Sequence, residues 1–95
     1  MRGVSSKPRV LTYGFVRKVV EGYLRERIAR ERGSVFTVKT RHVRCFAKKN
    51  FKTDISPMYI TPILINDFHE AVVGVGKLNG CIVVRYDKEK LVKII

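Results

Sequence analysis

The sequence predicts a small α+β domain, in which helices form the first part of the chain and a β-hairpin the last part. Apolar residues within residues 9–32 recur at spacings of three and four, which is typical of an amphipathic helix. Residues 72–86 form two β-branched runs separated by Asn79-Gly80, a dipeptide that favours a tight hairpin turn. The chain has 95 residues, 45% of them hydrophobic, which suits one core. We therefore expect a single domain over residues 9–95, after a flexible basic arm at residues 1–8.

The first helix is expected over residues 9–32. Its inner stripe begins at Tyr13 and ends at Ile28, and Glu21 precedes Arg25 at the favourable i,i+4 spacing. Gly33 is the residue type that most often follows the last turn of a helix, in the left-handed conformation. We therefore expect the helix to end at Gly33.

Residues 34–38 (SVFTV) predict a short strand that joins the later hairpin. A second helix is expected over about residues 39–51, capped by Thr37 or Thr40. The competing interpretation is a longer strand, Val35 to Cys45, but that stretch lacks the alternation of apolar and polar residues that a strand needs.

The stretch from Ile55 to Asp87 is expected to organise the domain. A third helix should run from about Pro62 to Val72, with Thr61 as its cap and Pro62 at the first helical position. The hairpin should follow directly, and residues 88–95 should form a short amphipathic segment that packs on the core.

The charge distribution indicates the class of partner. The net charge is +12, and residues 1–52 carry 15 basic and 3 acidic side chains, whereas residues 53–95 carry 5 of each. Such a positive field attracts polyanions, and nucleic acid is the first candidate. An anionic membrane surface or an acidic protein is the alternative.

Several other classes of function lack support in the sequence. No signal peptide or membrane span is recognised, so a cytoplasmic location without membrane association is expected. Cys45 and Cys81 have no metal-ligand spacing, and we expect two buried thiols, with a disulfide as the alternative. The carboxylates are scattered and predict no catalytic or metal site and no cofactor, so the chain is not expected to be an enzyme. The lack of Gln and Trp is typical of a protein from a thermophile.

The order of the expected elements resembles that of a winged helix-turn-helix domain, a family of DNA-binding modules. The resemblance rests on the strand around Val35–Val38, TRHVRCFAKKNF as second helix, SPMYITPILINDFHEAV as third helix and VVGVGKLNGCIVVRYD as wing. It implies three helices with a C-terminal hairpin wing, frequent dimerisation and a role in transcription regulation or DNA packaging. In such domains the third helix normally enters the major groove, and the wing touches adjacent phosphates.

The sequence departs from this pattern, because no Lys or Arg lies between Pro57 and Gly76. Two mechanisms therefore stay open. In one, the third helix reads bases and its neighbours contact phosphates. In the other, the basic first half binds the backbone, and the third helix forms a homodimer or binds a protein partner through Met58, Ile63 and Ile65. DNA is favoured over RNA, since few aromatic residues are expected at the surface. The candidate DNA-binding residues are Arg2, Lys7, Arg17, Lys18, Lys39, Arg41, Arg44, Lys48, Lys49, Lys52, Tyr59, Asn66, His69, Lys77 and Arg85.

Overall fold

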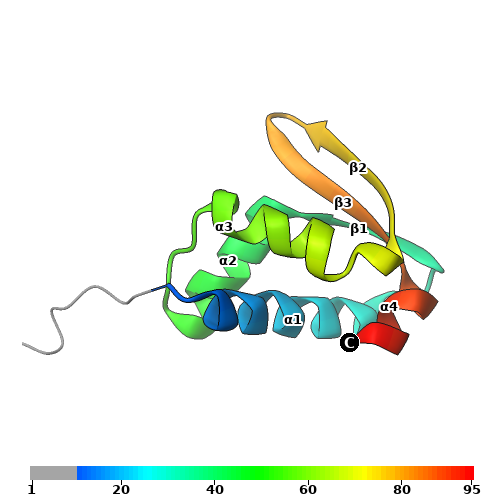
Figure 1. Cartoon of the computed structure of the whole chain (residues 1–95), viewed down its shortest axis with the longest axis horizontal. Helices are drawn as coiled ribbons and strands as arrows, with labels where there is room; N and C mark the ends of the chain where they lie inside the picture. Colours follow the sequence, from blue (N-terminus) through cyan, green and yellow to red (C-terminus); the bar gives the residue numbers. More distant parts are fainter. Residues whose placement is uncertain (1–10) are drawn as a thin grey trace, which may run out of the picture.

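A computed structural model of the chain describes residues 11–95 and confirms the α+β class. The elements follow the order expected from the sequence, but an additional helix, α4, closes the chain, so the expected count of three helices is too low. In Figure 1, α1 lies beneath α3, and the hairpin projects beyond the helices. The elements are α1 (Tyr13–Arg30), β1 (Val35–Lys39), α2 (Thr40–Phe51), α3 (Pro57–Pro62), the π-helical turn η2 (Ile63–Asp67), the 3-10 turn η3 (His69–Ala71), β2 (Val72–Leu78), β3 (Cys81–Asp87) and α4 (Lys88–Ile94).

Helix α1 is shorter than the sequence predicted at both ends. Thr12 caps it by accepting a hydrogen bond from the Phe15 N–H at 3.1 Å, so Tyr13 is the first helical residue and is exposed rather than part of the inner stripe. At the other end, Glu31 is already extended, and its N–H donates to the Arg27 carbonyl at 2.8 Å. The expected glycine cap is therefore wrong, and Gly33 does not have a positive φ angle.

The three strands form an antiparallel sheet in the order β1-β3-β2. The predicted strand at residues 34–38 does join the hairpin, with Val38 opposite Val84. The predicted turn is also confirmed, because Asn79 and Gly80 have φ angles of 53° and 77°, as a two-residue hairpin turn of this kind requires. Both β1 and β2 are edge strands, and the far part of the hairpin extends away from the core (Figure 1).

Helix α2 begins directly after β1, which excludes the longer strand considered from the sequence. Neither predicted cap is used, because Lys39 holds the N-cap position and its side chain makes no capping bond. Thr40 instead lies inside the helix and is buried, and its hydroxyl donates to the Ile82 carbonyl at 3.3 Å. Thr40 therefore ties the start of α2 to β3.

The third helical segment begins five residues earlier than predicted. Ser56 caps α3, accepting from the Met58 N–H at 3.4 Å, and Pro57 occupies the first turn. Thr61 and Pro62 consequently lie within the helix, which continues as η2 (Ile63–Asp67) rather than starting there. The predicted inner stripe of this segment is confirmed: Ile60, Leu64, Phe68 and Ala71 are all fully buried.

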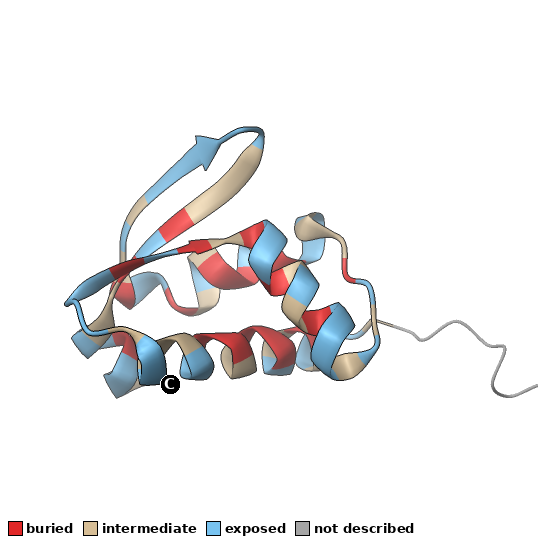
Figure 2. Ribbon diagram, turned by 180° about the vertical axis from the view of Figure 1, so that it is seen from behind, coloured by how far each residue is buried: buried red, intermediate tan, exposed pale blue. Residues whose placement is uncertain are grey.

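The core lies between the sheet and the helices, and every helix and the strands β1 and β3 contribute buried positions, whereas β2 contributes none (Figure 2). Tyr86 of β3 is fully buried, and its hydroxyl donates to the Leu64 carbonyl at 2.6 Å. This bond satisfies a backbone oxygen within η2 and links it to the sheet. In α4, which Asp87 caps through the Lys90 N–H, Leu91 is the residue that enters the core.

Candidate nucleic-acid interface

A hollow of about 280 Å³ forms where α2, the start of α3 and the hairpin turn meet. Two basic residues of α2, Arg41 and Arg44, line one wall, and the Asn79-Gly80 turn lines another. The hairpin turn is far from α2 and α3 in the sequence, and the Thr40 bond to β3 helps to bring it close to α2. The hollow is lined by Thr40, Arg41, Arg44, Pro57, Asn79, Gly80, Cys81 and Ile82.

Asp54 forms ion pairs with two basic residues of α2. It accepts two hydrogen bonds from Arg44, at 2.6 Å from Nε and 3.0 Å from Nη2, and Lys48 lies 3.8 Å from the same carboxylate. The hydrogen bond from Arg44 is the main reason that the pKa of Asp54 is lowered. Asp54 therefore orients Arg44 and neutralises part of its charge, an effect that the sequence did not reveal.

The remaining cations of this surface have no such partner. Arg41 and Lys49 of α2 are exposed, as are Lys52 directly after α2 and Lys77 beside the hairpin turn, and none forms an ion pair with another residue of the range 11–95. We call the group Arg41, Arg44, Lys48, Lys49, Lys52 and Lys77 the α2–wing surface. It can present several cations to a chain of phosphates.

The two cysteines differ in their surroundings. Cys45 is exposed on α2, so the expected burial is wrong there, and Cys81 is half-buried in the hollow. Burial raises the pKa of Cys81, but hydrogen bonding with Thr40 and the nearby Arg41 outweigh it, so the net shift is downward. The Thr40 Oγ1 lies 3.3 Å from the Cys81 sulfur.

Arg17, a candidate DNA-binding residue, forms contacts with other residues of the protein. Its Nε lies 3.1 Å from the Asp67 carboxylate, its guanidinium lies 5.1 Å from the centre of the Phe68 ring, and Glu21 is a further ion-pair partner at 3.7 Å. Asp67 also accepts a hydrogen bond from the Tyr13 hydroxyl. Asp67 thus faces α1, and Arg17 neutralises its charge locally.

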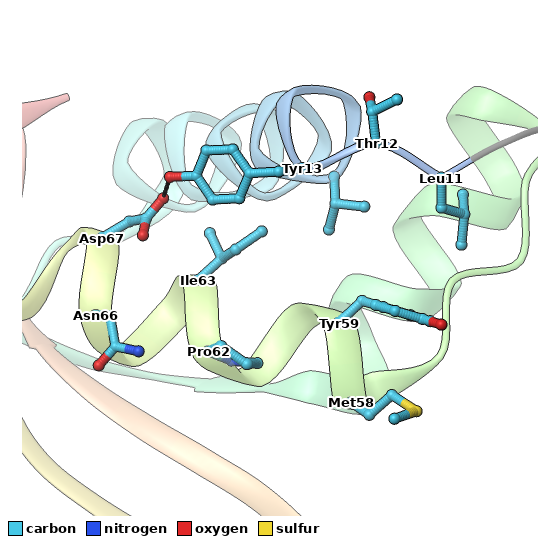
Figure 3. A pocket seen from close by; sticks show the side chains of 10 residues that line it. Leu11, Thr12, Tyr13, Met58, Tyr59, Pro62, Ile63, Asn66 and Asp67 are labelled. Carbon is cyan, nitrogen blue, oxygen red and sulfur yellow. Dashed lines mark hydrogen bonds between the residues drawn. The ribbon is translucent and has the colours of Figure 1, made fainter.

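A second hollow, of about 350 Å³, separates α1 from α3 and is lined mainly by apolar side chains (Figure 3). Tyr59 of α3 and Asn66 of η2, both candidate DNA-binding residues, line one side of this hollow, and Tyr13 of α1 lines the other. Met58 is 70% exposed at its rim, whereas Ile63 is 4% exposed. Of the predicted partner-binding residues, Ile63 therefore belongs to the core.

The other predicted residues lie apart from the α2–wing surface. Lys18 is exposed on α1, Arg85 is exposed on β3, and His69 is exposed with its Nδ1 3.1 Å from the Asn66 carbonyl oxygen. Lys39, half-buried at the end of β1, lines a separate hollow. Ile65 of η2 is half-buried against the core. Arg2 and Lys7 lie outside the described residues.

No family model, curated protein or solved structure shows significant similarity to this chain. Within residues 11–95, His, Cys, Asp and Glu form no group of three that could hold a metal ion. Over the same range, no helix is long and apolar enough to cross a membrane.

Proposed function

We propose that this protein binds double-stranded DNA through phosphate contacts, as a winged helix-turn-helix domain that serves in transcription regulation or DNA packaging. The observation that carries the proposal is the meeting of the basic helix α2, the start of α3 and the hairpin turn around one hollow. The pairing of β1 with the hairpin agrees with the resemblance found in the sequence. Backbone binding of this kind requires several cations on one surface, and the α2–wing surface supplies them.

The third helical segment is less suited to sequence reading than α2 is to backbone binding. Its exposed residues include Met58, Tyr59 and Pro62, and no Lys or Arg belongs to it. Asn66 is exposed and can offer paired hydrogen bonds to adenine. Without cations beside it, however, this helix would depend on α2 and the wing for nearly all of its phosphate contacts.

The proposal is tested by binding to random duplex DNA over a range of salt concentrations. Arg41→Gln/Lys49→Gln/Lys52→Gln removes cations that have no ion-pair partner within residues 11–95, so no ion pair described there is broken. We expect weaker binding and a salt slope that is shallower by about 0.9 for each lost phosphate contact. Arg32→Gln/Lys90→Gln/Lys93→Gln is the matched control, since it removes the same charge from exposed positions in and around α4.

The outcomes separate three mechanisms. An equal loss in both triple variants would mean that net charge alone attracts DNA, and it would contradict a defined surface. A larger loss from Asn66→Ala/His69→Ala would assign the binding to α3. If the native protein does not bind the duplex at low salt, the proposed function is wrong.

A second candidate function is protein interaction through the α1–α3 hollow. Among residues 11–95, Asp67 is the only charged residue that lines this hollow, so the described part of two basic copies can meet there without bringing lining cations together. Exposed Met58 at the rim offers a flexible apolar contact. We expect Met58→Asp to reduce self-association measured by sedimentation velocity, and Val92→Asp, at an exposed apolar residue of α4, to leave it unchanged. A native chain that stays monomeric at high concentration would contradict this candidate.

A further inference from the structure

A third hollow, of about 370 Å³, lies along the free edge of β1, between that strand, the C-terminal half of α1 and the first turn of α2. It is lined by Tyr23, Arg27, Arg30, Glu31, Thr37, Lys39 and His42. Three of these carry permanent positive charge, one is a histidine, and one is an acid. We call this group the β1-edge hollow.

The acid does not balance the cations. Glu31 is held by Arg27 at 2.9 Å, and Arg27 is fixed further by the Tyr23 hydroxyl at 3.1 Å and by its position over the Phe36 ring. Arg30 lies 3.6 Å from Glu26. Because both side chains are exposed, this ion pair is weak. Lys39 has no ion-pair partner among residues 11–95. The hollow therefore keeps a net positive charge.

The excess of positive charge affects the pKa of His42. Its pKa is lowered, first by partial burial and then by the positive charges of Lys39, Arg41 and Arg27. Glu31 and Tyr23 also face the hollow from α1, but Arg27 already binds both of them. An anion placed beside His42 would offset these charges and favour the protonated ring, which would then donate a further hydrogen bond.

The β1-edge hollow and the hollow at the hairpin turn open on different sides of α2. His42 and Arg44 are two residues apart on α2, a separation that turns side chains by about 200° around a helix. Arg44 lines the hollow at the hairpin turn, whereas His42 lines the hollow at the edge of β1. One straight duplex that lies against the hairpin turn would therefore leave the β1-edge hollow open.

We infer that the β1-edge hollow binds a backbone phosphate of a second DNA segment, so that one copy of the protein bridges two duplexes. The inference rests on the proposed function, because the α2–wing surface must hold the first duplex. Lys39 and Arg30 supply the charge that attracts the phosphate, and His42 supplies a donor that gains its proton on binding. Bridging of this kind suits a DNA-packaging protein.

The site itself is tested with inorganic phosphate as the probe, by following both histidines in NMR titrations. We expect phosphate to raise the pKa of His42 toward or above its ordinary value near 6.5 and to leave His69 unaffected. His69 is a matched control, since it is exposed on a different element and contacts the Asn66 carbonyl. No change at His42, or the same change at both rings, would overturn the site.

Bridging is tested by the capture of a labelled duplex on beads that carry a different duplex. The native chain should retain the label, and Arg30→Gln/Lys39→Gln should lose most of this retention while its binding to a single duplex in solution stays close to native. Lys90→Gln/Lys93→Gln is the control for loss of charge and should retain the label. Circular dichroism checks that each variant is folded.

The two proposals fail in different ways. If the native chain binds no single duplex, the proposed function fails. If it binds single duplexes but captures no second duplex, or if the Arg30→Gln/Lys39→Gln variant bridges as well as the native chain, only the inference about the β1-edge hollow fails. In the latter case bridging would come from self-association.

Discussion

Asp54 is the acidic residue that interacts directly with the α2–wing surface. Its two hydrogen bonds from Arg44 and its contact with Lys48 hold these cations against the protein. We predict that Asp54→Asn strengthens binding to duplex DNA and steepens the salt slope by about 0.9 for each cation that gains a phosphate contact. A salt titration of duplex binding measures both quantities.

The control for this prediction is Glu89→Gln, which changes the net charge equally at an exposed position on α4. Because the pKa of Asp54 is lowered, its carboxylate stays ionised as the pH falls through the usual range for aspartate and is protonated only in more acidic solution. A moderate change of pH therefore does not free Arg44, and the substitution is needed. Equal gains in both variants would show that the Asp54 ion pair itself does not limit binding.

Residue-scale signals predicted some features and left others ambiguous. Asn79-Gly80 fixed the hairpin turn because few other dipeptides adopt two positive φ angles. Ser56-Pro57 and Thr61-Pro62, in contrast, carry the same signal for a helix start, and the first of them is used. Which of the two signals starts the helix depends on the burial of Ile55 and Ile60, and burial is a property of the whole core.

Pro62 shows how one residue affects an element. It lies inside the third helical segment, with φ and ψ angles of −60° and −35°, and has no N–H to donate to the carbonyl one turn earlier. The π-helical turn Ile63–Asp67 follows directly. Such turns are rare and accompany local interruptions of helical hydrogen bonding.

We predict that Pro62→Ala increases the free energy of unfolding by about 2–3 kcal/mol. A proline in a helix interior costs about 3 kcal/mol relative to alanine, while the freer unfolded chain of the variant offsets up to about 1 kcal/mol. Pro62 is exposed, so the smaller side chain leaves no cavity. Urea unfolding measures the change. A less stable variant would mean that Pro62 relieves a strain that the restored hydrogen bond reintroduces.

At the scale of elements, periodicity predicted which helices and strands exist better than it predicted where they end. Most of the inner stripe of α1 follows from spacing alone, although Tyr13 is exposed. Lys39, in contrast, holds the N-cap of α2 because Thr40 is used to bond β3. The candidate interface was likewise predicted only in part. The basic face of α2 was predicted, whereas the neutralising role of Asp54 and the inward position of Asp67 depend on contacts between distant residues.

The whole molecule combines a large positive charge with few stabilising ion pairs. The chain has 20 basic and 8 acidic side chains, and the ion pairs found in residues 11–95 mostly join partly or fully exposed groups, which contribute little each. Repulsion between the unpaired cations should therefore exceed the attraction within the pairs. Salt screens both the repulsion and the attraction, so its net effect on the stability of the free protein depends on which of the two is larger.

We predict that raising NaCl from about 0.05 M to about 0.5 M increases the Tm of the free protein but reduces the additional stabilisation that duplex DNA provides. In the free protein, salt weakens the repulsion among cations such as Arg41, Lys49 and Lys52. In the complex, these same cations are already neutralised by phosphates, and salt competes for them. Thermal unfolding with and without DNA measures both trends. A Tm of the free protein that falls with salt would show that the ion pairs, not the excess of positive charge, dominate its electrostatics.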